Sequence, residues 1–277
     1  MKIEEYSFEI NNSIDRMVRG DVRSSGKGPR PAAIFLHGLK GFRNWGFIPY
    51  SCLRLARAGA IAVNFDFSLN GIRDENRPRF DESDFRRNTL SQELEDALLV
   101  IDSIRNGEIL SEFDKNNFSG EIYLIGHSLG GGISLIAASQ RKINKIALWA
   151  SVSAFDRYSP RQKHIWRKLG HMNTTVSQTG QKLPIGTDFL DDFEQHREKY
   201  DPVMNANRTD AEILVIQPTA DVTIAESEAR KLAAAAGTEP VFIERAGHTF
   251  GAEHPMDEAP EAVDKALDYT IRFFGIK

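Results

Sequence analysis

Short, mostly apolar segments that alternate with amphipathic ones constrain the fold of this chain more than any other feature of its sequence. Apolar runs of this length without polar alternation are typical of strands buried on both faces, as in parallel sheets. Their alternation with helical patterns predicts an α/β fold with a mostly parallel central sheet and helices on both faces. We expect strands over residues 32–36, 60–67, 121–126, 143–150, 211–217 and 241–244, and helices over 49–58, 91–106, 129–141, 226–236 and 260–274.

Three segments depart from this alternation. Residues 5–22 predict a β-hairpin with its turn at Asn11-Asn12, and the highly charged residues 71–88 predict a surface loop. Residues 153–207 are rich in His, Arg, Lys and Gln, poor in aliphatic side chains and without a strong strand pattern. We interpret 153–207 as an inserted helical cap on a core formed by residues 1–152 and 208–277.

Charge and cysteine content narrow the class of protein. The 277 residues include 35 Lys and Arg against 39 Asp and Glu, for a net charge of −4. This balance argues against nucleic acid or a membrane surface as partner. Cys52 is the only cysteine, so an intramolecular disulfide cannot form. The N-terminus shows no apolar signal-peptide core, and no apolar run reaches membrane-spanning length. We therefore expect a cytoplasmic protein.

The segment Gly126-His127-Ser128-Leu129-Gly130 is the strongest functional signal. It fits the pattern G-x-S-x-G, follows the predicted strand at 121–126 and opens the predicted helix at 129–141. A serine in such a tight turn projects its hydroxyl from the sheet, next to the positive end of a helix dipole. The alternatives are a Gly-rich turn or a phosphate-binding loop. The chain lacks both G-x-G-x-x-G at this place and a Gly-Lys-Ser/Thr segment, so we interpret Ser128 as a nucleophile.

A serine nucleophile needs a base, and the base needs a carboxylate. His248 lies between the last predicted strand and the last helix, where a loop can reach the carboxyl edge of a parallel sheet. Asp221 follows the predicted strand at 211–217. The alternatives are a structural loop histidine and an acidic helix N-cap. We assign His248 as the base, Asp221 as its partner, and His254 as a surface residue.

Acyl transfer also needs backbone N–H groups for the developing oxyanion. Leu129 follows the proposed nucleophile directly, so its N–H is one candidate donor. The second donor should come from the loop at residues 37–46, after the first long parallel strand, where Leu39 is the candidate by position. The alternative is a Gly-rich loop that only packs beneath the next helix.

Together these motifs resemble the α/β-hydrolase superfamily over about residues 30–275. The resemblance rests on the loop at His37-Gly38, the segment from Gly126 to Gly131, Asp221, and Gly247-His248, in the chain order Ser, Asp, His. Residues 37–46 and 64–71 are similar to bacterial hydrolases grouped with dienelactone hydrolases, serine aminopeptidase-like hydrolases and cinnamoyl esterases. True dienelactone hydrolases carry a cysteine nucleophile, whereas position 128 is serine.

The resemblance implies a carboxylesterase-like serine hydrolase with an α/β-hydrolase fold. Ser128, His248 and Asp221 would form the catalytic triad of a two-step acyl transfer, with Leu39 and Leu129 as the oxyanion hole. The expected substrate is a small-molecule ester with a small or medium acyl or aryl group. We expect no cofactor, no metal, no nucleic acid and no membrane partner. The oligomeric state stays open, with a homodimer as one option.

The same motifs are compatible with other functions. A peptidase or amidase, a thioesterase, or a non-catalytic ligand-binding homologue would share the same motifs. A metal site at 171–196 is disfavoured because its His and Asp residues lack a ligand spacing. The aromatic and aliphatic side chains of 153–207 could line a substrate pocket or anchor the cap. Its basic residues could indicate an acidic substrate group, but a solvated helix face is favoured for Arg157, Arg161, Lys163, Arg167 and Lys168.

Overall fold

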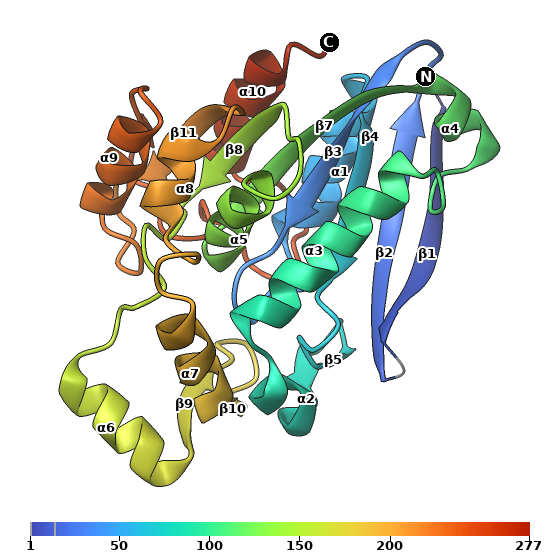
Figure 1. Cartoon of the computed structure of the whole chain (residues 1–277). Coiled ribbons are helices and arrows are strands. Elements are labelled where there is room, and N and C mark those ends of the chain that lie inside the picture. The colour runs from blue at the N-terminus through green and yellow to red at the C-terminus, as the bar shows by residue number, and fades with distance from the viewer. Residues whose placement is uncertain (1, 14) are drawn as a thin grey trace.

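The computed structural model describes residues 2–13 and 15–277, which fold around one large twisted sheet (Figure 1). Within these residues, eight strands form the sheet in the order β1-β2-β4-β3-β7-β8-β11-β12. Neighbouring strands are parallel from β4 to β12, and β1 and β2 add an antiparallel edge. The expected α/β-hydrolase architecture with a mostly parallel sheet is thus confirmed. The strands are β1 (Ile3–Ser13), β2 (Arg16–Ser25), β3 (Arg30–Leu36), β4 (Ile61–Asp66), β7 (Phe118–His127), β8 (Lys145–Trp149), β11 (Glu212–Pro218) and β12 (Val241–Ile243).

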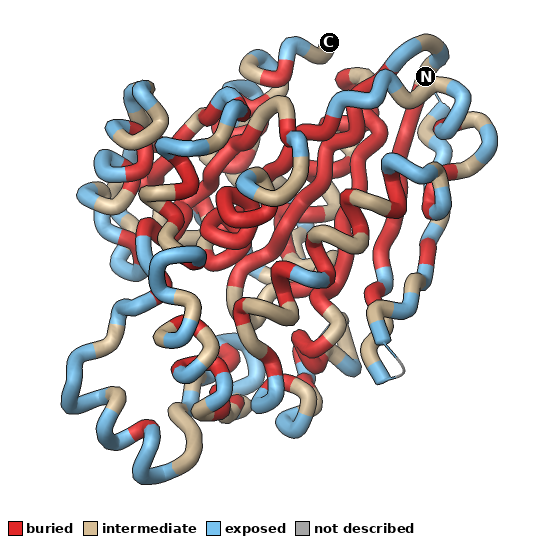
Figure 2. Tube along the Cα trace, in the orientation of Figure 1, coloured by how far each residue is buried: buried red, intermediate tan, exposed pale blue. Residues whose placement is uncertain are grey.

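Helices cover both faces of the sheet and divide the core in two. One buried cluster joins the sheet to α1 and α10, and the other joins it to α3, α5 and α9 (Figure 1). Figure 2 shows the central strands buried along most of their length. The helices of these layers are α1 (Phe47–Arg57), α3 (Leu90–Arg105), α5 (Leu129–Ala138), α9 (Glu226–Ala235) and α10 (Glu261–Phe274). A short helix, α4 (Glu112–Asn117), precedes β7.

The N-terminal hairpin is longer than the sequence indicated. Ser13 pairs with Arg16 and Asn11 pairs with Met17, so the predicted turn at Asn11-Asn12 is wrong and the two asparagines belong to β1. The side chain of Asn12 donates a 2.5 Å hydrogen bond to Asp96, which ties this part of the strand to α3. The predicted return strand at 13–22 includes Ile14, which lies outside the described residues, as does Met1.

Residues 71–88 form ordered elements where we expected only a loop. They comprise the hairpin of β5 (Ile72–Asp74) and β6 (Arg79–Phe80), followed by α2 (Glu82–Arg87). Phe80 and Phe85 are buried in the main core, and Asp81 caps α2 by accepting hydrogen bonds from two backbone N–H groups. The loop prediction rested on the many charged residues of this segment. The burial of the two aromatic side chains is favourable enough to order it nevertheless.

Residues 153–207 also contain strands that the sequence did not reveal. The segment forms α6 (Pro160–Leu169), the antiparallel pair β9 (His171–Thr175) and β10 (Lys182–Gly186), α7 (Thr187–Gln195) and most of α8 (Pro202–Arg208). In Figure 1, α6, α7, β9 and β10 lie together at the lower left, beyond the end of the sheet, whereas α8 contacts α5 and α9. No helix of residues 2–13 and 15–277 combines the length and apolar character that crossing a membrane requires.

A buried carboxyl group on α3 makes the stability of this fold depend on pH. Glu93 is buried, and one of its oxygens accepts a 2.7 Å hydrogen bond from Asn88. Its other oxygen, Oε2, has no hydrogen-bond partner among the described residues. Burial raises the pKa of Glu93 to about 8, and the nearby charge of Asp96 adds to this shift. The folded protein therefore favours the neutral acid.

We predict that Glu93→Gln removes part of the pH dependence of stability. Between about pH 4.5 and 8 the unfolded chain has released this proton and the folded chain still holds it. The free energy of unfolding of the wild type should therefore fall as pH rises through this window. Thermal unfolding between pH 5 and 8 should show a smaller decline for Glu93→Gln. The exposed Glu112→Gln serves as control, and parallel curves for wild type and Glu93→Gln would refute the prediction.

Candidate active site

Ser128 occupies a strained turn between β7 and α5. Its backbone has φ 57° and ψ −118°, a left-handed conformation that a residue with a Cβ rarely adopts. The surrounding chain fixes it, because its N–H donates to the Trp149 carbonyl at 3.0 Å and its carbonyl accepts from the N–H groups of Gly131 and Val152. Strain held in this way is typical of functional positions.

Glycines make this turn sterically feasible. A Cβ on Gly126 would lie 2.5 Å from the carbonyl oxygen of Gly130. A Cβ on Gly130 would lie 2.5 Å from the carbonyl oxygen of His37 and would also clash with that of Leu36. The backbones of β7, α5 and the end of β3 therefore meet without side chains between them.

His248 lies in the loop after β12 and reaches Ser128 across the edge of the sheet. The two atoms His248 Nε2 and Ser128 Oγ are 3.0 Å apart. The His248 carbonyl accepts a 3.0 Å hydrogen bond from Nε2 of His127. Burial, reinforced by the nearby His248, lowers the pKa of His127 to about 3, so this ring is neutral at physiological pH. His127 thus holds the loop that carries His248, a role that its place within the motif did not reveal.

Asp221 continues the chain of hydrogen bonds that links Ser128 to His248. Its Oδ2 lies 2.8 Å from His248 Nδ1 and also accepts from Gln217, and its Oδ1 accepts from the N–H groups of Thr223 and Ile224. Burial opposes ionisation, but these hydrogen bonds prevail and hold the pKa of Asp221 below its usual value. An ionised carboxylate only accepts, so His248 Nδ1 carries the proton and Nε2 is left to accept from Ser128.

Ser128 opens into a cleft of about 620 Å³ that is also lined by His248, Leu39 and Leu129. Leu129 is the first residue of α5, so its N–H has no acceptor within the helix. Leu39 belongs to the loop at residues 37–46, which lies directly against the serine. A Cβ added to Gly38 of this loop would lie 2.9 Å from the Cβ of Ser128. The structure therefore brings together all five residues that the sequence singled out.

A buried polar cluster supports the loop at residues 37–46 from behind. Asp66, at the end of β4, accepts a 2.7 Å hydrogen bond from the N–H of Arg43 and a 3.2 Å bond from Asn70. The Arg43 side chain lies within 4 Å of the carboxylates of Asp66, Asp21 and Glu75. Burial raises the pKa of Asp66 to about 6, although the Arg43 N–H and charge oppose that shift.

The large apolar side chains of 153–207 serve mainly as anchors. Trp166, Phe189 and Phe193 are buried, with Trp166 stacked on Phe189 at 6.3 Å between ring centroids. The cleft receives mostly smaller or polar side chains from this segment, namely Arg157, Tyr158, Gln162, Thr174, Val176, Ser177 and Gln178. Two of the basic residues are held in ion pairs outside the cleft: Lys163 with Asp156 and Glu194, and Arg167 with Asp191 and Glu194.

No group of three or more His, Cys, Asp or Glu side chains in the described part of the chain is arranged to hold a metal ion. Of the His and Asp residues in 171–196, Asp192 instead accepts hydrogen bonds from Ser91 and lies 3.2 Å from His196. Cys52 is buried in α1, and burial raises the pKa of its thiol to about 12, as expected for an inert core cysteine.

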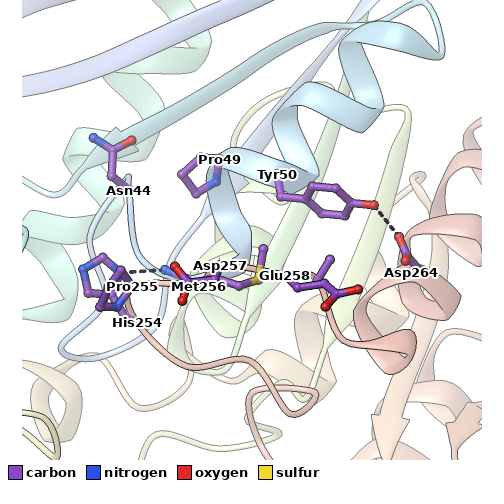
Figure 3. Close-up of a pocket in the computed structure, with 11 residues that line it drawn as sticks. Asn44, Pro49, Tyr50, His254, Pro255, Met256, Asp257, Glu258 and Asp264 are labelled. Carbon is purple, nitrogen blue, oxygen red and sulfur yellow. Dashed lines mark hydrogen bonds between the residues drawn. The ribbon is translucent and has the colours of Figure 1, made fainter.

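A second hollow, of about 590 Å³, lies between α1 and the segment before α10 (Figure 3). His254 lines it, but its ring is engaged: Nδ1 accepts from the N–H of Gly46 at 3.0 Å, and Nε2 donates to the carbonyl of Glu75. His254, which we assigned as a surface residue, is half-buried, and its ring also links three separate loops. Across the hollow, Tyr50 donates to Asp264 at 2.7 Å.

Comparison with known proteins identifies the family. Residues 33–266, most of the chain, match the model of the alpha/beta hydrolase family. The chain belongs to this family. A search of the curated proteins finds no match. The family match and the fold together establish the protein as an α/β hydrolase.

Solved structures share the fold of this hydrolase over nearly their whole length, at low sequence identity. Alpha/beta hydrolase domain-containing protein 10 from mouse is 15% identical with a TM-score of 0.70, covering 98% of each chain. Est1E from Butyrivibrio proteoclasticus is 15% identical with a TM-score of 0.67, covering 97% of each. Dienelactone hydrolase from Anabaena variabilis is 15% identical with a TM-score of 0.64, covering 99% of this chain and 98% of its own.

We predict that Gly130→Ala destabilises the hydrolase by about 1–3 kcal/mol, because its methyl group meets backbone oxygens of two residues that cannot move independently. Chemical denaturation monitored by circular dichroism measures the loss. Gly247→Ala is the matched control, since its Cβ would meet nothing nearer than 4.0 Å. Equal stability of the two variants would show that the backbones around Ser128 are not in the contact described.

Proposed function

We propose that this α/β hydrolase cleaves carboxylic esters with a small or medium acyl or aryl group. The observation that carries the proposal is the unbroken chain of contacts from Ser128 Oγ through His248 to Asp221, at the floor of an open cleft. Nucleophile, base and orienting carboxylate lie at hydrogen-bond distance in the order that acyl transfer requires.

In the first step, Ser128 Oγ attacks the ester carbonyl carbon while its proton passes to His248 Nε2. The ionised Asp221 stabilises the resulting imidazolium and keeps the ring in the required orientation. The N–H groups of Leu39 and Leu129 would bind the oxyanion, helped by the positive end of the α5 dipole. Collapse of the tetrahedral intermediate breaks the bond to the alcohol, which takes the proton from His248 Nε2.

In the second step, water attacks the acyl-serine ester. His248 Nε2 accepts a proton from the water and returns it to Ser128 Oγ as the carboxylic acid leaves. His248 accepts and returns a proton in both steps, so the rate of each step depends on its accurate placement. The hydrogen bond from His127 to the His248 backbone serves this placement.

The structural relatives support an ester substrate. Est1E has a structure with ferulic acid bound, an aryl-substituted carboxylic acid, and this chain covers 99% of that structure at 15% identity and a TM-score of 0.66. The similarity to a dienelactone hydrolase adds ring esters as a related class. We further propose that residues 153–207 act as a cap, because they form one wall of the cleft over Ser128.

We predict that a fluorophosphonate probe labels the wild type at Ser128, because an activated serine next to an imidazole is nucleophilic. Ser128→Ala should lose both the labelling and the hydrolysis of p-nitrophenyl butyrate. Ser139→Ala, at the far end of α5, is the control and should keep both. Labelled wild type that cleaves amino-acid p-nitroanilides much faster than esters would favour the amidase alternative. Absence of labelling in folded protein would overturn the proposal.

Asp221→Asn should lower kcat by about 1,000- to 10,000-fold with little change in fold. The amide preserves the shape of the side chain but can present N–H to His248 Nδ1, which favours the wrong tautomer. Steady-state kinetics and circular dichroism measure the two quantities. Asp188→Asn, at an exposed position of α7, is the matched control. A loss of less than about tenfold for Asp221→Asn would remove this carboxylate from the mechanism.

A further inference from the structure

The charge of the cleft over Ser128 is one-sided. Its described lining residues include two cations, Lys40 and Arg157, and neither Asp nor Glu. The polar remainder of the wall consists of uncharged groups, among them Gln162, Ser177 and Gln178. A cleft of this composition attracts negative charge.

The charge of Arg157 is already compensated. Its guanidinium lies 3.0 Å from a carboxylate oxygen of Glu228 and donates to the Thr223 carbonyl at 2.8 Å. Glu228 also accepts from the N–H of Ser153. Arg157 therefore ties the start of the 153–207 segment to α9, and its charge has a partner within the protein.

Lys40 has no such compensation. Its Nζ donates to the carbonyl of Thr175 at 2.8 Å, and no carboxylate of residues 2–13 or 15–277 forms an ion pair with it. An ammonium group has three protons to donate, so this contact leaves capacity for a ligand. Burial lowers the pKa of Lys40, and no neighbouring anion offsets the shift.

The backbone of Lys40 is also strained. Its φ is 64°, in the left-handed region where glycine would be unstrained. A Cβ added to Gly38 would lie 2.9 Å from that of Ser128, so the backbone at Gly38 is next to the serine. Lys40 is two residues further along the chain, so its Cα lies at most about 7.6 Å from that of Gly38. A residue with a long cationic side chain is thus held in an unfavourable backbone conformation in the lining of the cleft over Ser128.

We propose that the ester substrate carries an anionic group, such as a carboxylate, away from the scissile bond, and that Lys40 binds this group. The inference rests on the proposed ester hydrolysis at Ser128 and specifies its substrate class. The anion would approach the ammonium from the cleft, while the Thr175 carbonyl holds the side chain in place. The competing role for Lys40 is a purely structural link between the 37–46 loop and the β9–β10 hairpin.

Paired substrates that differ only in charge distinguish the two roles. On the acyl side, p-nitrophenyl hydrogen adipate is compared with p-nitrophenyl methyl adipate. On the alcohol side, 4-acetoxybenzoate is compared with its methyl ester. For each pair we measure the ratio of kcat/KM for the anionic ester to kcat/KM for the neutral one, in wild type, Lys40→Met, Lys40→Glu and the exposed control Lys182→Met.

We expect the wild type to prefer the anionic member of at least one pair, and that pair identifies the side of the substrate that faces Lys40. Lys40→Met should reduce the ratio by about tenfold, and Lys40→Glu should reduce it further. Lys182→Met should leave the ratio unchanged, since this charge lies outside the cleft. In wild type alone, the preference should weaken as ionic strength rises, a test that does not depend on how the variants fold.

A structural link would give a different pattern. Both members of each pair would then lose the same factor in Lys40→Met, and the thermal midpoint would fall. An unchanged ratio in Lys40→Met, or a wild type that prefers neutral esters in both pairs, would overturn the inference. If fluorophosphonate still labels Ser128 in that case, the ester hydrolase proposal stands. If neither ester is cleaved and Ser128 is not labelled, the function itself fails.

Discussion

The close approach of three backbones around Ser128 is the constraint on which the rest of the site depends. Glycines at positions 126 and 130 let β7, α5 and the end of β3 meet without intervening side chains. This packing, with hydrogen bonds from both sides of the turn, maintains a serine conformation that an isolated peptide would avoid. The packing of the core thus offsets the unfavourable backbone conformation of Ser128. This conformation places the Ser128 hydroxyl at the carboxyl edge of the sheet.

The electrostatic arrangement follows from the same placement. Asp221 stays ionised in a buried position because four donors surround it, including the backbone N–H groups of Thr223 and Ile224. His127, by contrast, is kept neutral by burial, so it adds a fixed hydrogen bond without adding charge beside His248. Among the described residues that line the cleft, Lys40 is the only cation without a carboxylate partner, and the proposed preference for an anionic substrate rests on it.

The sequence predicted most strands and helices of the central sheet and its two helical layers. The elements that it did not predict share a common cause. Continuous apolar runs such as those of β3 and β8 identify buried strands because both of their faces must be covered. The elements of 71–88 were missed because their residues are mostly polar. The β9–β10 hairpin was missed because its two five-residue strands are short, and β10 contains a proline, Pro184. Their order comes from a few long-range contacts, such as the burial of Phe80 and Phe85 and the hydrogen bonds of Gln181 to Phe80. The turn predicted at Asn11-Asn12 also failed for a long-range reason. Both asparagines lie in β1, and Asn12 donates a hydrogen bond to Asp96 on α3.

The sequence by itself determined the fold class, the strand-turn-helix around Ser128, and the three residue types that acyl transfer needs. Short-range sequence patterns are enough to predict these features, because a turn between a strand and a helix involves only residues that are close together in the chain. Only the tertiary structure decided that Asp221, His248 and Ser128 meet, that His127 and Gln217 hold two of them in place, and that Lys40 lacks a counterion. These contacts join residues from 4 to more than 100 positions apart, and their formation depends on the register of the whole sheet.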